Sequence, residues 1–186
     1  MHTVAFHTHP PVHPGELTVV VGSGASGEAA ARLLHALGFR VRVLERTAGN
    51  VSDAFRSFAA AAGVEVMCGE HSAAQFAGAS LVVTSPGVPV HVLRPFLEQA
   101  AALPEHTGAG LGSIPLMGEM ELALSCVQEP ILAVTGSSGK TTTVSLAAAM
   151  LERAGKKVFL GGNIGTPLSS YVLAGGGADV LVLELS

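Results

Sequence analysis

Short apolar runs alternate along the chain with stretches in which apolar residues recur at helical spacing. The runs at 17–21, 41–45, 64–67, 81–84 and 114–117 predict five buried strands. Helical patterns separate them at 26–37, 53–62, 73–76 and 90–102, the last disturbed by Pro95. This alternation predicts an α/β fold, a doubly wound, Rossmann-like parallel sheet of five strands.

The alternation resumes after Gly118 and predicts a second unit. A connecting helix at 119–125 leads to strands at 131–134, 158–160 and 180–184, with a long helix at 140–154 that Gly155 ends. Glycine-rich loops are expected at 108–112 and 161–165. The chain is therefore interpreted as a flexible leader at 1–16, a first domain at 17–117, and the first part of a second domain at 118–186.

Composition and charge exclude several classes of protein. Apolar residues make up 48% of the chain and charged residues 13%, which suits a packed core and not disorder. The net charge of −4 gives no reason to expect nucleic acid or anionic lipid as a partner. No stretch predicts a membrane span or a secretory signal, so a cytoplasmic protein is expected.

Cysteine and histidine do not form a recognisable metal pattern. Cys68 and Cys126 lie outside any metal-ligand spacing and are expected to be reduced. The leader holds His2, His7, His9 and His13 among Pro and Thr, and flexibility is favoured there over metal binding.

A first glycine loop follows the first predicted strand. Gly22-Ser23-Gly24-Ala25-Ser26-Gly27 matches GxGxxG and opens a helix, so its backbone N–H groups can approach a pyrophosphate. Glu45 ends the next strand, where it can accept hydrogen bonds from a ribose or a base. The motif does not identify the nucleotide. Three interpretations stay open: a purely structural glycine turn, an NAD(P) site, or a UDP-sugar site.

A second glycine loop is the strongest local signal. Thr135-Gly136-Ser137-Ser138-Gly139-Lys140-Thr141-Thr142-Thr143 stands between a strand and a helix. Lys140 would reach the β and γ phosphates of a nucleotide, and the Thr141 hydroxyl would bind Mg²⁺. Val134 stands where GxxxxGK[ST] has its first glycine. Glu184 closes the strand 180–184, either to hold Mg²⁺ or as a solvated carboxylate.

Five ordered motifs resemble those of the Mur ligases, ATP-dependent enzymes of peptidoglycan precursor synthesis. They are the TGSSGKTTT loop, in which Ser138 replaces the usual Asn, the Ser85-Pro86-Gly87 turn, the GEMEL segment from Gly118, the GNIG segment from Gly162, and VLELS from Val182. The first loop and its small-residue helix fit the branch of this family that adds D-glutamate to UDP-N-acetylmuramoyl-L-alanine.

The resemblance implies a role for each matching residue. The Ser23–Gly27 loop, Glu45, Arg46 and Ser85 would contact the UDP-precursor, and Asn163 would hold it near the reacting phosphate. ATP would lie on Gly136, Ser137, Ser138, Gly139, Lys140, Thr141 and Thr142, with Lys140 neutralising developing charge. Thr141 and Glu184 would hold Mg²⁺. UDP-N-acetylmuramoyl-L-alanine and D-glutamate would be the substrates of a monomer without nucleic-acid or membrane partners.

The resemblance also implies parts that are not among these 186 residues. Family members continue beyond the ELS segment and add a domain for the incoming amino acid, so this chain alone is expected to be inactive. Three alternatives stay open: a non-catalytic nucleotide-binding remnant, a ligase for another amino acid, and an NAD-dependent oxidoreductase. The second glycine loop argues against the oxidoreductase.

Overall fold

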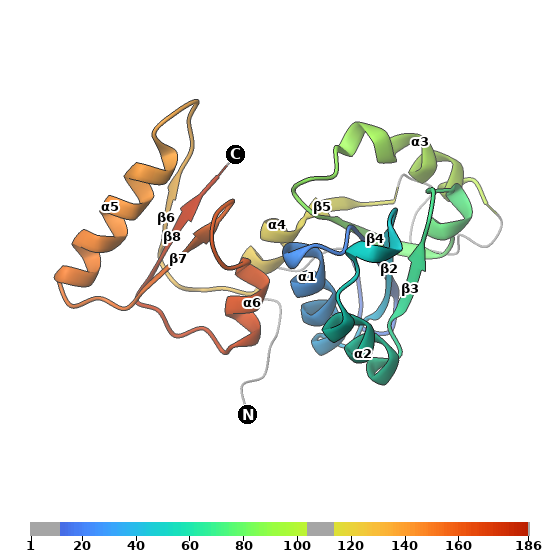
Figure 1. Ribbon diagram of the computed structural model, residues 1–186, viewed down its shortest axis with the longest axis horizontal. Coiled ribbons are helices and arrows are strands. Elements are labelled where there is room, and N and C mark those ends of the chain that lie inside the picture. The colour runs from blue at the N-terminus through green and yellow to red at the C-terminus, as the bar shows by residue number, and fades with distance from the viewer. Residues whose placement is uncertain (1–11, 104–113, 186) are drawn as a thin grey trace.

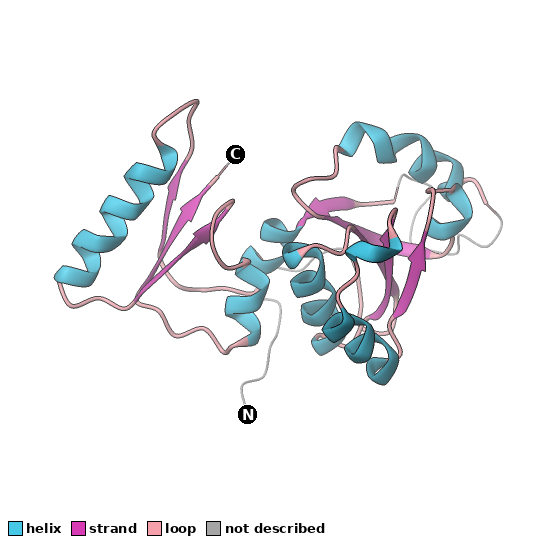
Figure 2. Cartoon of the chain, in the orientation of Figure 1, coloured by secondary structure: helices cyan, strands magenta, loops and turns pink. Residues whose placement is uncertain are grey.

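The computed structural model describes residues 12–103 and 114–185. Two parallel β-sheets with helices packed on them confirm the predicted α/β fold (Figures 1 and 2). The 108–112 loop and His2, His7 and His9 lie outside the described residues. No helix in the described ranges is long and apolar enough to cross a membrane.

The first sheet has five strands in the order β3-β2-β1-β4-β5. The strands are β1 (Leu17–Val21), β2 (Arg40–Glu45), β3 (Glu65–Cys68), β4 (Ala79–Thr84) and β5 (Leu116–Gly118). The helices between them are α1 (Ala25–Ala36), α2 (Asp53–Ala62) and α3 (Val90–Ala101), with 3₁₀ turns η1 (Ala48–Asn50) and η2 (Ala73–Phe76). Because the order reverses beside β1, the carboxyl ends of β1 and β4 frame the switch point where ligands bind in such sheets.

The second sheet has three described strands in the order β6-β8-β7. The strands are β6 (Ile131–Val134), β7 (Val158–Gly162) and β8 (Val180–Glu184). The helices are α4 (Glu119–Leu124), α5 (Lys140–Arg153) and α6 (Leu168–Leu173). Helix α5 packs on one face through Val144 and Ala148, which contact Val182 of β8.

Local signals explain the helix ends that were predicted. The Ser52 side chain accepts a hydrogen bond from Phe55 N at 3.1 Å and so caps α2. Gly63 ends α2 in the left-handed conformation at φ 69°. Two short elements, η1 and α6, were not predicted, because η1 has only three residues and α6 has neither a side-chain cap nor a charged residue in its end turns to mark it.

The two sheets share one apolar core. Leu33 and Leu34 of α1, Leu122 of α4, Leu168 of α6 and Leu183 of β8 are buried in the same cluster. Helices α4 and α6 accordingly lie between the sheets in the ribbon view (Figure 1). The fold therefore joins the two sheets, each with its glycine loop, through packed helices and not through a linker alone.

Candidate functional site

The glycines of the first loop differ in backbone conformation and in how closely other atoms pack against them. Gly22 has φ 96°, and its N–H donates to Leu44 O at 2.8 Å. A Cβ on Gly27 would lie 1.9 Å from Gly22 O and 2.8 Å from Ser85 Oγ, so packing requires glycine there. A Cβ on Gly24 would meet nothing within 4 Å. Gly24 is also exposed and precedes α1, so the space beside it is available to a ligand.

Glu45 organises the loop from the end of β2. Its Oε2 accepts from Ser23 N at 2.9 Å and Ser23 Oγ at 2.8 Å. Its Oε1 accepts from Thr47 N at 3.1 Å and Asn50 Nδ2 at 3.0 Å. Burial by itself raises the pKa of Glu45. The four hydrogen bonds, led by that from Thr47 N–H, lower the pKa by more than burial raises it, so that it falls from 4.5 to about 2. The carboxylate is therefore ionised and already hydrogen-bonded by the protein.

Ser85 joins the same site from the end of β4. Its N–H donates to Val21 O at 3.0 Å, and its Oγ lies 3.5 Å from Gly22 O. Ala25 and Ser26 stand in the first turn of α1 beside it. The structure thus brings the first-loop residues, Glu45 and Ser85 together. Arg46 extends to the rim, where it pairs with Glu70 at 3.0 Å and stays largely exposed.

A cavity of about 700 Å³ opens at the carboxyl ends of β1, β2 and β3. Arg46, Glu70 and His71 line one side, and Val88, Pro89, Val92 and Phe96 form an apolar wall at the start of α3. Burial, and then the nearby Arg46 charge, lower the pKa of His71. His71, Asn50 and the α3 wall were missed by sequence analysis, because no local motif marks them and only the fold gathers them.

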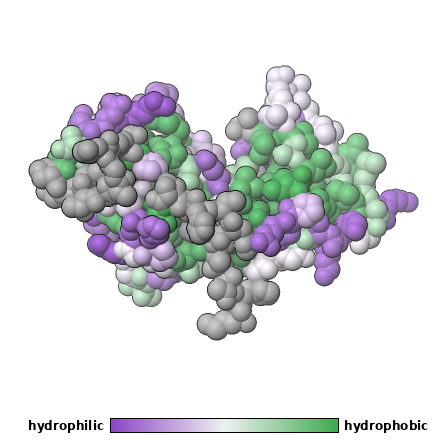
Figure 3. Space-filling view, turned by 180° about the vertical axis from the view of Figure 1, so that it is seen from behind, coloured by the Kyte–Doolittle hydropathy of each residue, from purple (hydrophilic) through white to green (hydrophobic). Residues whose placement is uncertain are grey.

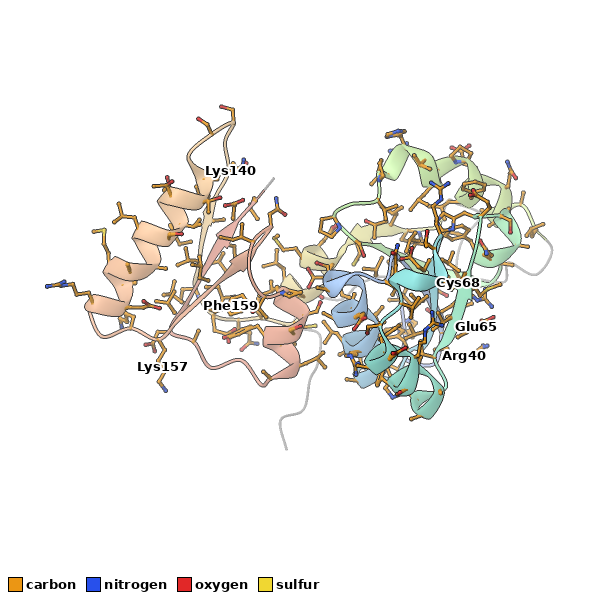
Figure 4. All side chains as sticks on the ribbon, viewed as in Figure 1. Arg40, Glu65, Cys68, Lys140, Lys157 and Phe159 are labelled. Carbon is orange, nitrogen blue, oxygen red and sulfur yellow. The ribbon has the colours of Figure 1, made fainter. Side chains whose placement is uncertain are left out.

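The second glycine loop has its own backbone geometry. Gly136 has φ 148° and Gly139 has φ 74°, the region that favours glycine. Gly139 precedes α5 directly, and Lys140 begins that helix near the carboxyl end of β6 (Figure 4). Lys140 Nζ donates to Gly136 O at 2.8 Å. Ser137, Ser138 and Thr142 are exposed around it, so the loop presents backbone and hydroxyl groups to solvent.

Thr141, in the first turn of α5, is hydrogen-bonded to Glu184 at the end of β8. Thr141 Oγ1 donates to Glu184 Oε2 at 2.6 Å, although 43 residues separate them. Mg²⁺ is commonly held by one or two protein oxygens, with water and phosphate completing six ligands. This hydroxyl–carboxylate pair beside a phosphate-type loop fits that ion. Among the described residues, no group of three or more His, Cys, Asp or Glu could hold a metal by itself.

Asn163 lies next to this pair. Its N–H donates to Glu184 O at 3.0 Å, directly after Gly162, the last residue of β7. A Cβ on Gly162 would lie 2.3 Å from Glu184 O, so glycine permits this close approach. Asn163 is exposed and directly follows Gly162, which pairs with Glu184 at the carboxyl ends of β7 and β8. The second site therefore assembles from three strand ends.

Two protein-family comparisons match this architecture in order. Residues 16–104 match the Mur ligase MurD-like N-terminal domain, and residues 134–186 match the Mur ligase middle domain. The chain belongs to the Mur ligase family. The resemblance inferred from the five motifs is thereby confirmed.

Three curated relatives of this Mur ligase chain share one name. A UDP-N-acetylmuramoylalanine–D-glutamate ligase of Oleidesulfovibrio alaskensis is 57% identical over all of this chain and 41% of its own length. One of Nitratidesulfovibrio vulgaris is 59% identical over 94% of the chain and 38% of its length. One of Anaeromyxobacter dehalogenans is 43% identical over 92% and 35%. The chain spans about two fifths of the relatives' length.

Among solved structures, a pseudomurein peptide ligase type C from Methanothermus fervidus resembles this chain. It is 22% identical with a TM-score of 0.49, over 91% of this chain and 33% of that one. This likeness is too distant to inform the chemistry of either loop.

Proposed function

We propose that the chain is the nucleotide-binding part of an ATP-dependent ligase that adds D-glutamate to UDP-N-acetylmuramoyl-L-alanine. Residues 17–117 would bind the UDP-precursor, and residues 118–186 would form the first part of the ATP-binding domain. The observation that carries the proposal is the pair of loops: an open Gly24 loop on one sheet and a Lys140 loop beside Thr141–Glu184 on the other. The relatives' shared name supports the choice of substrates. A cytoplasmic monomer is proposed with it.

The residues of the second loop would act by charge and position. Lys140, released from Gly136 O, would place its ammonium on the β and γ phosphates of ATP. Thr141 and Glu184 would hold Mg²⁺, which when bound neutralises phosphate charge. The precursor's terminal carboxylate would attack the γ-phosphorus as ADP leaves, giving an acyl phosphate. The amine of D-glutamate would then displace phosphate to form the amide. Asn163, beside Glu184, would help position the precursor.

Calorimetric titration tests the first half of the proposal. UDP-N-acetylmuramoyl-L-alanine and UDP should bind the chain, and NAD should bind more weakly than either, because the similar proteins are named as ligases of a UDP-linked substrate. The matched comparison is Lys140→Ala, which changes the first residue of α5 beside the other sheet and should leave these affinities unchanged. Tighter binding of NAD than of both uridine ligands would contradict the proposal.

Two variants of the second loop should differ in their dependence on Mg²⁺. Lys140→Ala removes a charge from the phosphates, so ATP should bind more weakly with or without the ion. Thr141→Ala removes a metal ligand, so its loss should appear mainly when Mg²⁺ is present. Titration of ATP into both variants, with Mg²⁺ and with EDTA, measures this. Equal losses for both variants in both buffers would show that the roles are misassigned.

A further inference from the structure

Helix α6 lies between the helix that follows the first glycine loop and strand β7 of the second sheet, and it packs against both. It packs against α1, which begins at the first glycine loop, and against α4. It also follows the 163–167 segment, whose Asn163 N–H donates to Glu184 O. The centroid of its Tyr171 ring lies 4.4 Å from that of Phe159 on β7. Any shift of α6 would therefore disturb the surroundings of both loops.

A single buried carboxylate ties α6 to the first sheet. Glu119 follows β5 directly and is only 3% exposed. Its Oε1 accepts a hydrogen bond from Ser169 N, in the first turn of α6, at 2.7 Å. Ser169 is 0% exposed, and Leu122 of α4 and Leu168 of α6 are buried in the same apolar cluster. The bond joins residues 50 positions apart, one beside each sheet.

A buried carboxylate is energetically unfavourable at position 119. Burial of a charge is costly unless hydrogen bonds compensate it, and an apolar side chain would have completed the core without that cost. Among the described residues, the ion pairs are Arg42–Glu65 and Arg46–Glu70, so no cation neutralises Glu119. The carboxylate makes the packing of α6 specific. Its hydrogen bond to the Ser169 N–H can form in only one position of α6 against α4, whereas apolar contacts alone would allow the helix to shift along its neighbours.

We propose that Glu119 is a positioning residue that couples the uridine-nucleotide loop to the Asn163–Glu184 region by holding α6 in register. The path runs from the Gly24 loop through α1 to α6, and from α6 through Asn163 to Glu184 and its bond with Thr141. This proposal about Glu119 depends on the proposed function only because it names a uridine nucleotide as the ligand of the first loop. Contact along a path is not coupling, so the test measures coupling directly.

Hydrogen exchange of the 186-residue chain, with and without UDP, provides that measurement. In the unsubstituted chain, UDP should slow exchange at 25–36 and also at 163–173. Glu119→Ala should speed exchange at 163–173 by about tenfold or more without ligand, and UDP should then slow only 25–36. Glu119→Gln keeps an acceptor oxygen and should retain the response at 163–173. UDP affinity itself should change little, since its site lies on the first sheet.

Two controls isolate the carboxylate. Glu121→Gln changes an exposed carboxylate on the same helix and should behave as the unsubstituted chain. Ser169→Ala removes a buried hydroxyl that has no hydrogen-bond partner in the structure and keeps the N–H that Glu119 binds, so it too should leave the response intact.

The outcomes separate this inference from the proposed function. A UDP response at 163–173 that survives Glu119→Ala would overturn the positioning role. So would loss of protection at β1–β4 together with 163–173 in both Glu119 variants, because Glu119 would then be an ordinary core residue. If UDP slowed exchange nowhere, the proposed uridine site would fail instead. Unchanged ligand-free exchange at 163–173 in Glu119→Ala would still overturn the inference by itself.

Discussion

At the scale of single residues, the first loop contains one glycine that packing requires, Gly27, and one that has open space beside it, Gly24. Gly27→Ala should destabilise the chain by about 2 kcal/mol or more, because its Cβ would strike the backbone oxygen of Gly22. Gly24→Ala should change stability by less than about 0.5 kcal/mol, since nothing lies within 4 Å and φ is −69°. It should instead weaken UDP about tenfold. Urea unfolding and calorimetry measure the two effects, and a stable Gly27→Ala variant would contradict this reading of the loop.

Glu45 should make the stability of the first sheet depend on pH. Its pKa falls from 4.5 to about 2 on folding, so its contribution is complete above pH 4.5 and is lost as the pH falls towards 2. Glu45→Gln should be less stable at neutral pH, because an amide N–H₂ would face the donors Ser23 and Asn50. Unfolding free energies between about pH 6 and 3 should fall more steeply for the unsubstituted chain than for this variant. Parallel pH curves would exclude the contribution.

At the scale of elements, helix α2 depends on its cap. Ser52 Oγ accepts from Phe55 N and donates to Glu28 Oε1 at 2.6 Å, which ties the start of α2 to α1. Ser52→Ala should cost about 1 kcal/mol. Ser57→Ala is the matched control, because Ser57 Oγ bonds only Asp53 O within its own helix, and it should be nearly neutral. Chemical denaturation compares the two, and equal costs would show that the cap is not what stabilises α2.

At the scale of the whole molecule, the two sheets differ in how well they are covered. Strands β1 and β4 are buried and flanked on both sides, whereas β6 is an edge strand with Ile131 at 46% and Leu132 at 41% exposed. On α5, Leu146 and Met150 are 60% and 65% exposed. Seen from behind, apolar surface accordingly spreads over the half of the molecule that holds the second sheet (Figure 3).

This difference predicts unequal protection against hydrogen exchange. Amides of β1 should exchange about tenfold more slowly than those of β6, because strands with few buried contacts open more easily. Mg²⁺ and ATP, bound at the proposed site, should slow exchange in the second sheet and so reduce the difference in exchange rate between the β1 and β6 amides. Equal protection of the two sheets without ligand would mean that their shared core makes them one cooperative unit.

The sequence alone determined the elements whose signals are local. The predicted bounds of α2, β1, β6 and β8 agree with those observed, because apolar period, a serine cap and a closing glycine act over a few residues. It also placed the two glycine loops, since each lies directly between a strand and a helix. Helix α6, which has no side-chain cap and no charged residue in its end turns, was missed.

The tertiary structure decided which groups those elements bring together. Glu45 was expected to face a ligand, yet the fold directs four protein donors to its carboxylate. Gly24 and Gly27 are alike in the motif, and only packing shows that one is crowded and the other open. Glu119 was placed by its sequence only in a short connecting helix, and the fold buries it and bonds it to Ser169 of α6, 50 positions away. Pairings over tens of residues depend on how sheets and helices dock, and no local pattern carries that information.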